Sequence, residues 1–201
     1  MDKSFFKATD FFKSACYFEA ALILVAIVLG QIADINPFAN IVFSETALAY
    51  GLLGTIPLFL MFLGMEQLQA KSVSHIRKLL LNTLGPGLHQ YHWTDLFLLA
   101  ALAGVSEELV FRGVIQPWIE QSWGLAAGLI VSNMLFGLVH AVTPLYAALA
   151  ALVGIYLGLS MDYAGERNLL TPIIIHSFYD LLAFVALMRV YRASLNSANI
   201  N

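Results

Sequence analysis

The chain has 201 residues, of which 60% are hydrophobic and only 11% are charged, and its mean hydropathy is +0.79. A soluble domain is about one-quarter charged, and a soluble core of this size could not bury so much apolar surface. The composition therefore excludes intrinsic disorder, collagen-like repeats and nucleic-acid binding, and it predicts a single membrane-embedded domain over residues 1–201. The net charge of -3 adds little, and the lone Cys16 excludes an intramolecular disulfide, a cysteine metal knuckle and a redox pair.

Six apolar segments follow one another along the chain, each close to the roughly 20 residues that cross a bilayer as a helix. They cover about 17–33, 47–65, 96–117, 124–142, 145–161 and 169–188. The sequence therefore predicts an all-α fold, a polytopic membrane bundle of about six transmembrane helices. No small-residue cleavage site follows the first segment, so we expect it to be an uncleaved anchor rather than a signal peptide.

The lysines and arginines predict the orientation of the bundle. They gather before the first segment, between the second and third, and after the sixth, whereas Arg167 falls on the opposite side. Because such residues stay on the cytoplasmic side, we expect a multi-pass protein with both termini in the cytoplasm. The brevity of the chain favours a bacterial cell membrane.

The connector between Glu66 and Trp93 contains a basic amphipathic stretch. We expect it to lie on the inner membrane surface and to end at Gly85–Pro86–Gly87, and the alternative is a plain connector.

Ionisable side chains inside the predicted spans are the strongest functional signal. Each costs about 2.5 to 3.5 kcal/mol on insertion scales, so each is a functional hypothesis by default. The set is Glu19, Glu107, Glu108, Arg112, His140, His176 and Asp180. Glu19 is close enough to the inner end of its span to reach the interface, so we expect no function there.

The adjacent acids Glu107 and Glu108 are predicted to have different partners. Successive residues on a helix point about 100° apart. Glu108 is four residues before Arg112 and can form an ion pair with it, whereas Glu107 needs a partner from another helix, for which His140 and His176 are candidates. The alternatives are interhelical hydrogen bonds that hold the bundle together, or a proton or ion pathway.

Three motifs occur in order in this part of the chain: EExxxR at 107–112, FxxxH at 136–140 and HxxxD at 176–180. Together they resemble the motifs of the CAAX protease and bacteriocin-processing (CPBP or Abi) family of intramembrane proteases. The resemblance covers a catalytic core of about residues 95–188. The eukaryotic Ras-converting CAAX endopeptidase usually has Asn at the last motif position, where this chain has Asp180.

The resemblance implies an intramembrane endopeptidase that acts on membrane-associated or lipidated peptides. Peptide hydrolysis needs an activated water, an oxyanion stabiliser and a proton donor for the leaving amine. By the resemblance, Glu107 is the general base, His140 helps to hold the water, and His176 with the residue four positions later faces the oxyanion. An ionised Asp180 can only accept hydrogen bonds, so we expect it to accept one from a nitrogen of His176. That bond would fix the tautomer of the ring or keep the ring protonated, so that the other N–H points at the oxyanion. The implied catalytic set is Glu107, His140, His176 and Asp180, with Glu108, Arg112 and Phe136 as structural support.

The resemblance favours a mechanism without a cofactor. The alternative is one divalent metal such as zinc, bound by Glu107, His140, His176 and Asp180 with an open position for water, although the sequence has no HExxH motif. The expected partners are the bilayer and a membrane-associated peptide or protein, and no nucleic acid. Two other functions stay open. One is a proton- or ion-coupled transporter that uses the same acids and histidines as a relay, and the other is a non-catalytic scaffold or immunity protein.

Overall fold

The computed structural model describes residues 3–163 and 165–198, with the side chains of 10–163 and 165–197. Across these residues the chain forms helices and no strand, so the predicted all-α fold class is confirmed. The elements are α1 (Lys3–Ala33), α2 (Glu45–Gln67), α3 (Lys71–Leu88), α4 (Trp93–Val110), η1 (Phe111–Ile115), α5 (Gln116–Trp123), α6 (Leu125–Val139), α7 (Pro144–Ser160) and α8 (Leu170–Ala198). The short η1 is a π-helical turn that joins α4 to α5.

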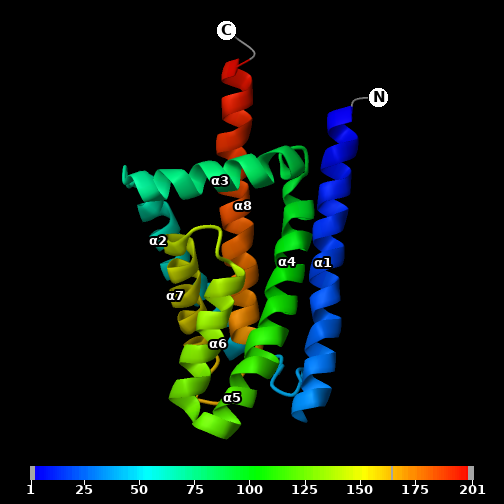
Figure 1. Ribbon diagram of the computed structural model, residues 1–201, viewed down its shortest axis with the longest axis vertical. Helices are drawn as coiled ribbons and strands as arrows, with labels where there is room; N and C mark the ends of the chain where they lie inside the picture. The colour runs from blue at the N-terminus through cyan, green and yellow to red at the C-terminus, as the bar shows by residue number, and fades with distance from the viewer. Residues whose placement is uncertain (1–2, 164, 199–201) are drawn as a thin grey trace.

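The long helices run side by side, and α3 lies across one end of the bundle (Figure 1). Helix α1 begins and α8 ends at this same end, while α5 lies at the opposite end. Helix α4 packs between α1 and α8, α2 packs against α8, and α6 pairs with α7. Helix α4 therefore lies between two long helices, and it carries Glu107 and Glu108 of the first motif, while Arg112 follows on η1.

Three helical segments in the described residues are long and apolar enough to cross a membrane: Asp10–Ala33, Glu45–Gln67 and Leu170–Ser197. Large apolar side chains face outward on the first two of these segments, including Leu24 (64% exposed) and Leu53 (62%). Together with the apolar composition, these helices make the chain a helical membrane protein.

Helices α6 and α7 are apolar but shorter than the predicted spans. They have 15 and 17 residues, or about 22 and 26 Å of helix, against a hydrocarbon core of about 30 Å. The turn between them lies below the level of α3 (Figure 1). The predicted helices at 124–142 and 145–161 are therefore present, but six complete spans remain a prediction.

The predicted amphipathic stretch forms α3, whose last turn contains Gly85–Pro86–Gly87 and which ends one residue later, at Leu88, close to the predicted end. The two glycines permit close packing. A Cβ atom on Gly85 would collide with the ring of Tyr191 on α8, and one on Gly87 would collide with the ring of Phe11 on α1. The two glycines therefore allow the last turn of α3 to pack closely against α8 and α1.

Candidate active site

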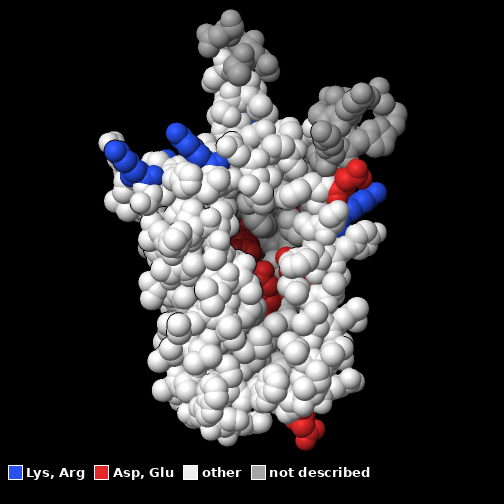
Figure 2. All heavy atoms as spheres, in the orientation of Figure 1, with Lys and Arg blue, Asp and Glu red and all other residues white. Residues whose placement is uncertain are grey.

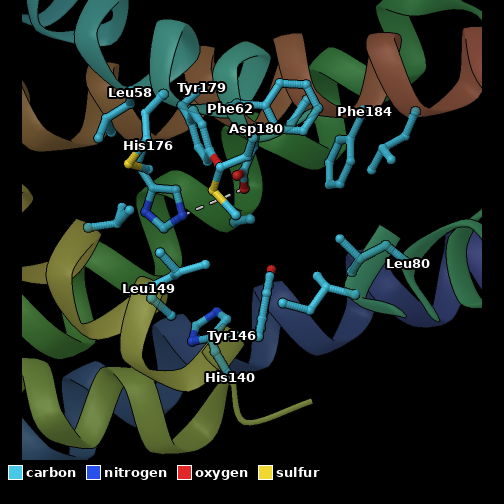
Figure 3. Close-up of a pocket in the computed structure, with 18 of the residues that line it drawn as sticks. Leu58, Phe62, Leu80, His140, Tyr146, Leu149, His176, Tyr179, Asp180 and Phe184 are labelled. Atoms are coloured by element: carbon cyan, nitrogen blue, oxygen red, sulfur yellow. Dashed lines mark ion pairs between the residues drawn. The ribbon is translucent and has the colours of Figure 1, made fainter. Parts of the chain in front are cut away.

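A cavity of about 300 Å³ lies inside the bundle, lined by residues of α1, α2, α3, α4, α6, α7 and α8. On the face shown in Figure 2 the molecule is hollowed below α3, and acidic side chains are visible at the bottom of the hollow. In the close-up of the pocket, His176 and Asp180 lie on one side of the space and His140 and Tyr146 on the other (Figure 3). The ionisable side chains that line the cavity are Glu19, Glu66, Arg77, Glu107, His140, Tyr146, His176, Tyr179 and Asp180.

Glu107, on α4, is the carboxylate that faces both imidazoles. Its side chain is 13% exposed, and its Oε2 lies 3.4 Å from His140 Nε2 and 3.9 Å from His176 Nε2. This oxygen is buried and has no hydrogen-bond partner among the described residues. Nearly all buried polar atoms are hydrogen-bonded, so an unpartnered oxygen in a cavity is suited to bind a water or a substrate group.

The FxxxH spacing has a local structural reason. Helix α6 ends at Val139, so the carbonyl groups of its last turn lack intrahelical partners. His140 Nδ1 lies 2.8 Å from the carbonyl oxygen of Phe136. A carbonyl can only accept, so Nδ1 carries the hydrogen and Nε2 is the nitrogen that faces Glu107. The Phe136 ring packs against the imidazole, with centroids 4.4 Å apart.

His176 is held by a different carboxylate from the one predicted. Its Nδ1 lies 2.8 Å from Glu108 Oε1, which is a hydrogen bond, whereas its Nε2 lies 3.6 Å from Asp180 Oδ2, beyond hydrogen-bond distance. The hydrogen bond predicted between His176 and Asp180 is therefore not formed, although the two side chains lie at ion-pair distance. Asp180 is one turn along the same helix and reaches only the Nε2 edge, while Glu108 approaches Nδ1 from α4.

Arg112 completes a buried network behind His176. Its Nη1 donates to Glu108 Oε1 at 2.8 Å, so the predicted intrahelical pair is present. Its Nη2 donates to Asn133 Oδ1 at 2.8 Å and to the Gly154 carbonyl oxygen at 2.7 Å. A continuous chain of hydrogen bonds thus runs from Asn133 and Gly154 through Arg112 and Glu108 to His176. The roles of Asn133 and Gly154 were not predicted from the sequence, although a polar Asn inside an apolar helix was a signal.

Phe136 has a second role in this network. The Arg112 guanidinium carbon lies 4.6 Å from the centroid of its ring, within the range of a cation–π contact. The residue predicted as structural support therefore contacts both Arg112 and His140.

Gly154→Ala tests how tightly this network is packed. A Cβ atom there would lie 2.6 Å from Asn133 Oδ1 and 3.1 Å from Arg112 Nη2, so the alanine would push both groups apart. We expect a loss of about 1 to 3 kcal/mol in unfolding free energy, measured by denaturation in detergent micelles. Gly64→Ala is the matched control, because nothing lies within 4 Å of a Cβ atom there, and it should be neutral or slightly stabilising. Equal effects of the two substitutions would contradict this packing argument.

The sequence predicted that the Glu19 side chain extends to the membrane interface. In the structure it points into the cavity instead. Its Oε2 accepts a hydrogen bond from Ser106 Oγ at 2.7 Å, and the side chain lines the cavity. The reason is that α1 begins at Lys3, far before the predicted start at 17, so Glu19 lies well inside a long helix that packs against α4.

The described residues contain no group of three or more His, Cys, Asp or Glu side chains arranged to hold a metal ion. The four residues proposed as zinc ligands share the cavity, and metal binding by them stays a prediction.

The fold and the site define a helical membrane protein with carboxylates and imidazoles gathered around an internal cavity. Residues 89–182 match the model of the family described as Type II CAAX prenyl endopeptidase Rce1-like. This segment contains all three motifs, so the family resemblance that they indicate is confirmed. Neither a curated protein nor a solved structure matches the chain.

Proposed function

We propose that this protein is an intramembrane endopeptidase of the CAAX type, which hydrolyses membrane-associated or lipidated peptides with a water activated by Glu107. The observation that carries the proposal is the buried Oε2 of Glu107, which has no hydrogen-bond partner among the described residues and faces the Nε2 atoms of two imidazoles in a cavity. The family match over residues 89–182 supports the same reaction class.

In this proposal a water binds between Glu107 Oε2 and His140 Nε2. It gives one proton to Glu107 as its oxygen attacks the peptide carbonyl carbon, and the negative charge moves to the carbonyl oxygen. His176 Nε2–H stabilises this oxyanion, since Nδ1 is engaged by Glu108 and fixes the direction of the ring. Glu107 then passes its proton to the leaving amine, and the peptide bond breaks.

Asp180 acts on His176 in this scheme rather than on the substrate. A carboxylate 3.6 Å from Nε2 favours a hydrogen on that nitrogen, which is the hydrogen that the oxyanion needs. Direct contact between an ionised Asp180 and the oxyanion would be repulsive.

The wall of the cavity suits a lipidated or strongly apolar peptide. Leu58, Phe62, Leu80, Leu149 and Phe184 line the same space as the two histidines (Figure 3). These side chains offer apolar contacts to a hydrocarbon chain while the polar end holds the scissile bond.

We propose a reaction without a metal, because the donor side chains are not arranged as a coordination site. We also propose that the end of the bundle that carries α3 faces the cytoplasm. The basic residues at this end support that orientation.

In the test, membrane peptides are incubated with liposomes that contain either the full-length wild type or the Glu107→Gln variant. The cleavage products of the two incubations are then identified by mass spectrometry and compared. We expect products that appear only with the wild type and that persist in a strong chelator. Glu45→Gln, a carboxylate at the first turn of α2 and outside the cavity, is the matched control. Identical profiles for wild type and Glu107→Gln would overturn the proposal and favour a transporter or scaffold, while loss of products in chelator would overturn its metal-free part.

A further inference from the structure

We propose that Glu19 is a specificity-determining residue that binds the cationic side chain of a lysine or arginine in the peptide substrate. The inference rests on the proposed endopeptidase function and adds a preference for one class of substrate. Glu19 lies on α1, outside the segment 89–182 that matches the family model. The family match therefore assigns it no role, and the groups around it are what define its chemistry.

The carboxylate of Glu19 has a neutral partner and no cationic one. Ser106 Oγ donates to Oε2 at 2.7 Å, but a hydroxyl satisfies one oxygen and leaves the charge uncompensated. None of the ion pairs in the described part of the chain involves Glu19. Holding an uncompensated carboxylate within a membrane bundle is costly, so a cation supplied by a ligand would stabilise it.

Glu19 shares its cavity with the residues of the proposed reaction, including Glu107 and Asp180. Ser106 also links the two places, because it immediately precedes Glu107 on α4 and its hydroxyl is fully buried. A substrate side chain that reaches Glu19 therefore belongs to a peptide whose backbone passes the site of hydrolysis.

Among the described residues that line the cavity, no lysine or arginine is free to compete with a substrate cation for Glu19. Arg77 lines the cavity, and its Nε already forms an ion pair with Glu66 Oε1 at 2.9 Å. Arg77 also donates to the Glu66 carbonyl oxygen. The remaining carboxylates create a negative potential that attracts a cationic side chain and disfavours an acidic one at the same place.

The alternative is a purely structural role, in which the Glu19–Ser106 hydrogen bond only stabilises the packing of α1 against α4. Two substitutions separate this role from charge recognition. Glu19→Gln keeps an oxygen that can accept from Ser106 and removes the charge, whereas Ser106→Ala removes the hydrogen bond and keeps the charge.

The experiment uses the full-length protein in liposomes and a peptide that it cleaves. A series of peptides carries one lysine each, placed at every position within four residues of the scissile bond. For each position, kcat/KM is compared between the lysine peptide and the same peptide with glutamine at that position. For the wild type we expect one position at which lysine raises kcat/KM about tenfold over glutamine, as a charge-assisted contact would. In Glu19→Gln this ratio should fall to about one, while Ser106→Ala, Glu19→Asp and the remote Glu45→Gln should retain most of it.

Each outcome decides the inference. A wild type that cleaves lysine and glutamine peptides alike at every position would overturn it, as would a ratio that survives in Glu19→Gln. Loss of the ratio in Ser106→Ala together with its survival in Glu19→Gln would assign the pair a structural role. If Glu19→Gln does not fold, loss of the ratio in the charge-retaining Glu19→Asp would overturn the inference. Absence of any Glu107-dependent cleavage would overturn the proposed function as well, so the two failures are distinguishable.

Discussion

Glu107→Gln is expected to lower kcat about 10³-fold or more while leaving the fold intact. An amide cannot take a proton from water at neutral pH, and a positioned general base contributes about 10² to 10⁴ in rate. The substitution conserves shape, and the Oε2 atom that it alters makes no hydrogen bond within the described residues. The measurements are the initial rate of peptide cleavage in liposomes and the unfolding temperature in detergent.

The same two measurements on Glu45→Gln give the background effect of removing a glutamate charge, which should be negligible for both. A Glu107→Gln variant that keeps more than about one-tenth of the wild-type rate would mean that another group removes the proton from water, since the lost contribution would be below the range of general base catalysis. A drop of the unfolding temperature in Glu107→Gln alone would mean that the carboxylate has a structural role.

Most of what the sequence predicted of this site depends on local geometry; the exception is Glu107, whose expected interhelical partners His140 and His176 lie 3.4 and 3.9 Å from its Oε2. The Glu108–Arg112 pair follows from four-residue spacing along the helical chain. Phe136 and His140 have the same spacing, but the bond from His140 to the Phe136 carbonyl oxygen was not predicted. The apolar segments predicted the helices for the same reason, because the length of an apolar run is a property of a single segment.

The parts that the sequence did not predict depend on which helices become neighbours. Spacing placed Asp180 next to His176, yet the Nδ1 atom of that ring bonds to Glu108, which lies 68 positions away in the chain. Glu19 and Ser106 are 87 positions apart and meet because α1 packs on α4. Interhelical partners of this kind follow from packing, which one sequence does not specify residue by residue.

Arg112→Met is expected to destabilise the fold by about 3 to 5 kcal/mol, the range for removing one partner of a buried ion pair. The guanidinium is buried and donates to Glu108, Asn133 and the Gly154 carbonyl oxygen, so its loss removes the countercharge of the Glu108 carboxylate and one donor from each of two other acceptors. Because Glu108 also fixes His176, we expect the rate of cleavage to fall together with the stability. Denaturation in detergent micelles gives the unfolding free energy.

Arg167→Met is the matched control, because Arg167 also pairs with a glutamate, Glu120, at 2.6 Å, but its side chain is 25% exposed. The hydrogen bond to Glu120 raises the pKa of Arg167 above its ordinary value, so this arginine is charged. A partly exposed ion pair nevertheless contributes only about 1 kcal/mol or less to the unfolding free energy. The double variant Arg112→Met with Glu108→Gln should be more stable than the sum of the two single losses predicts, since it removes both charges of the buried pair. Equal losses of unfolding free energy in Arg112→Met and Arg167→Met would contradict this prediction. Simple additivity in the double variant would mean that Arg112 and Glu108 are not a coupled pair, and that the pair does not hold His176 in place.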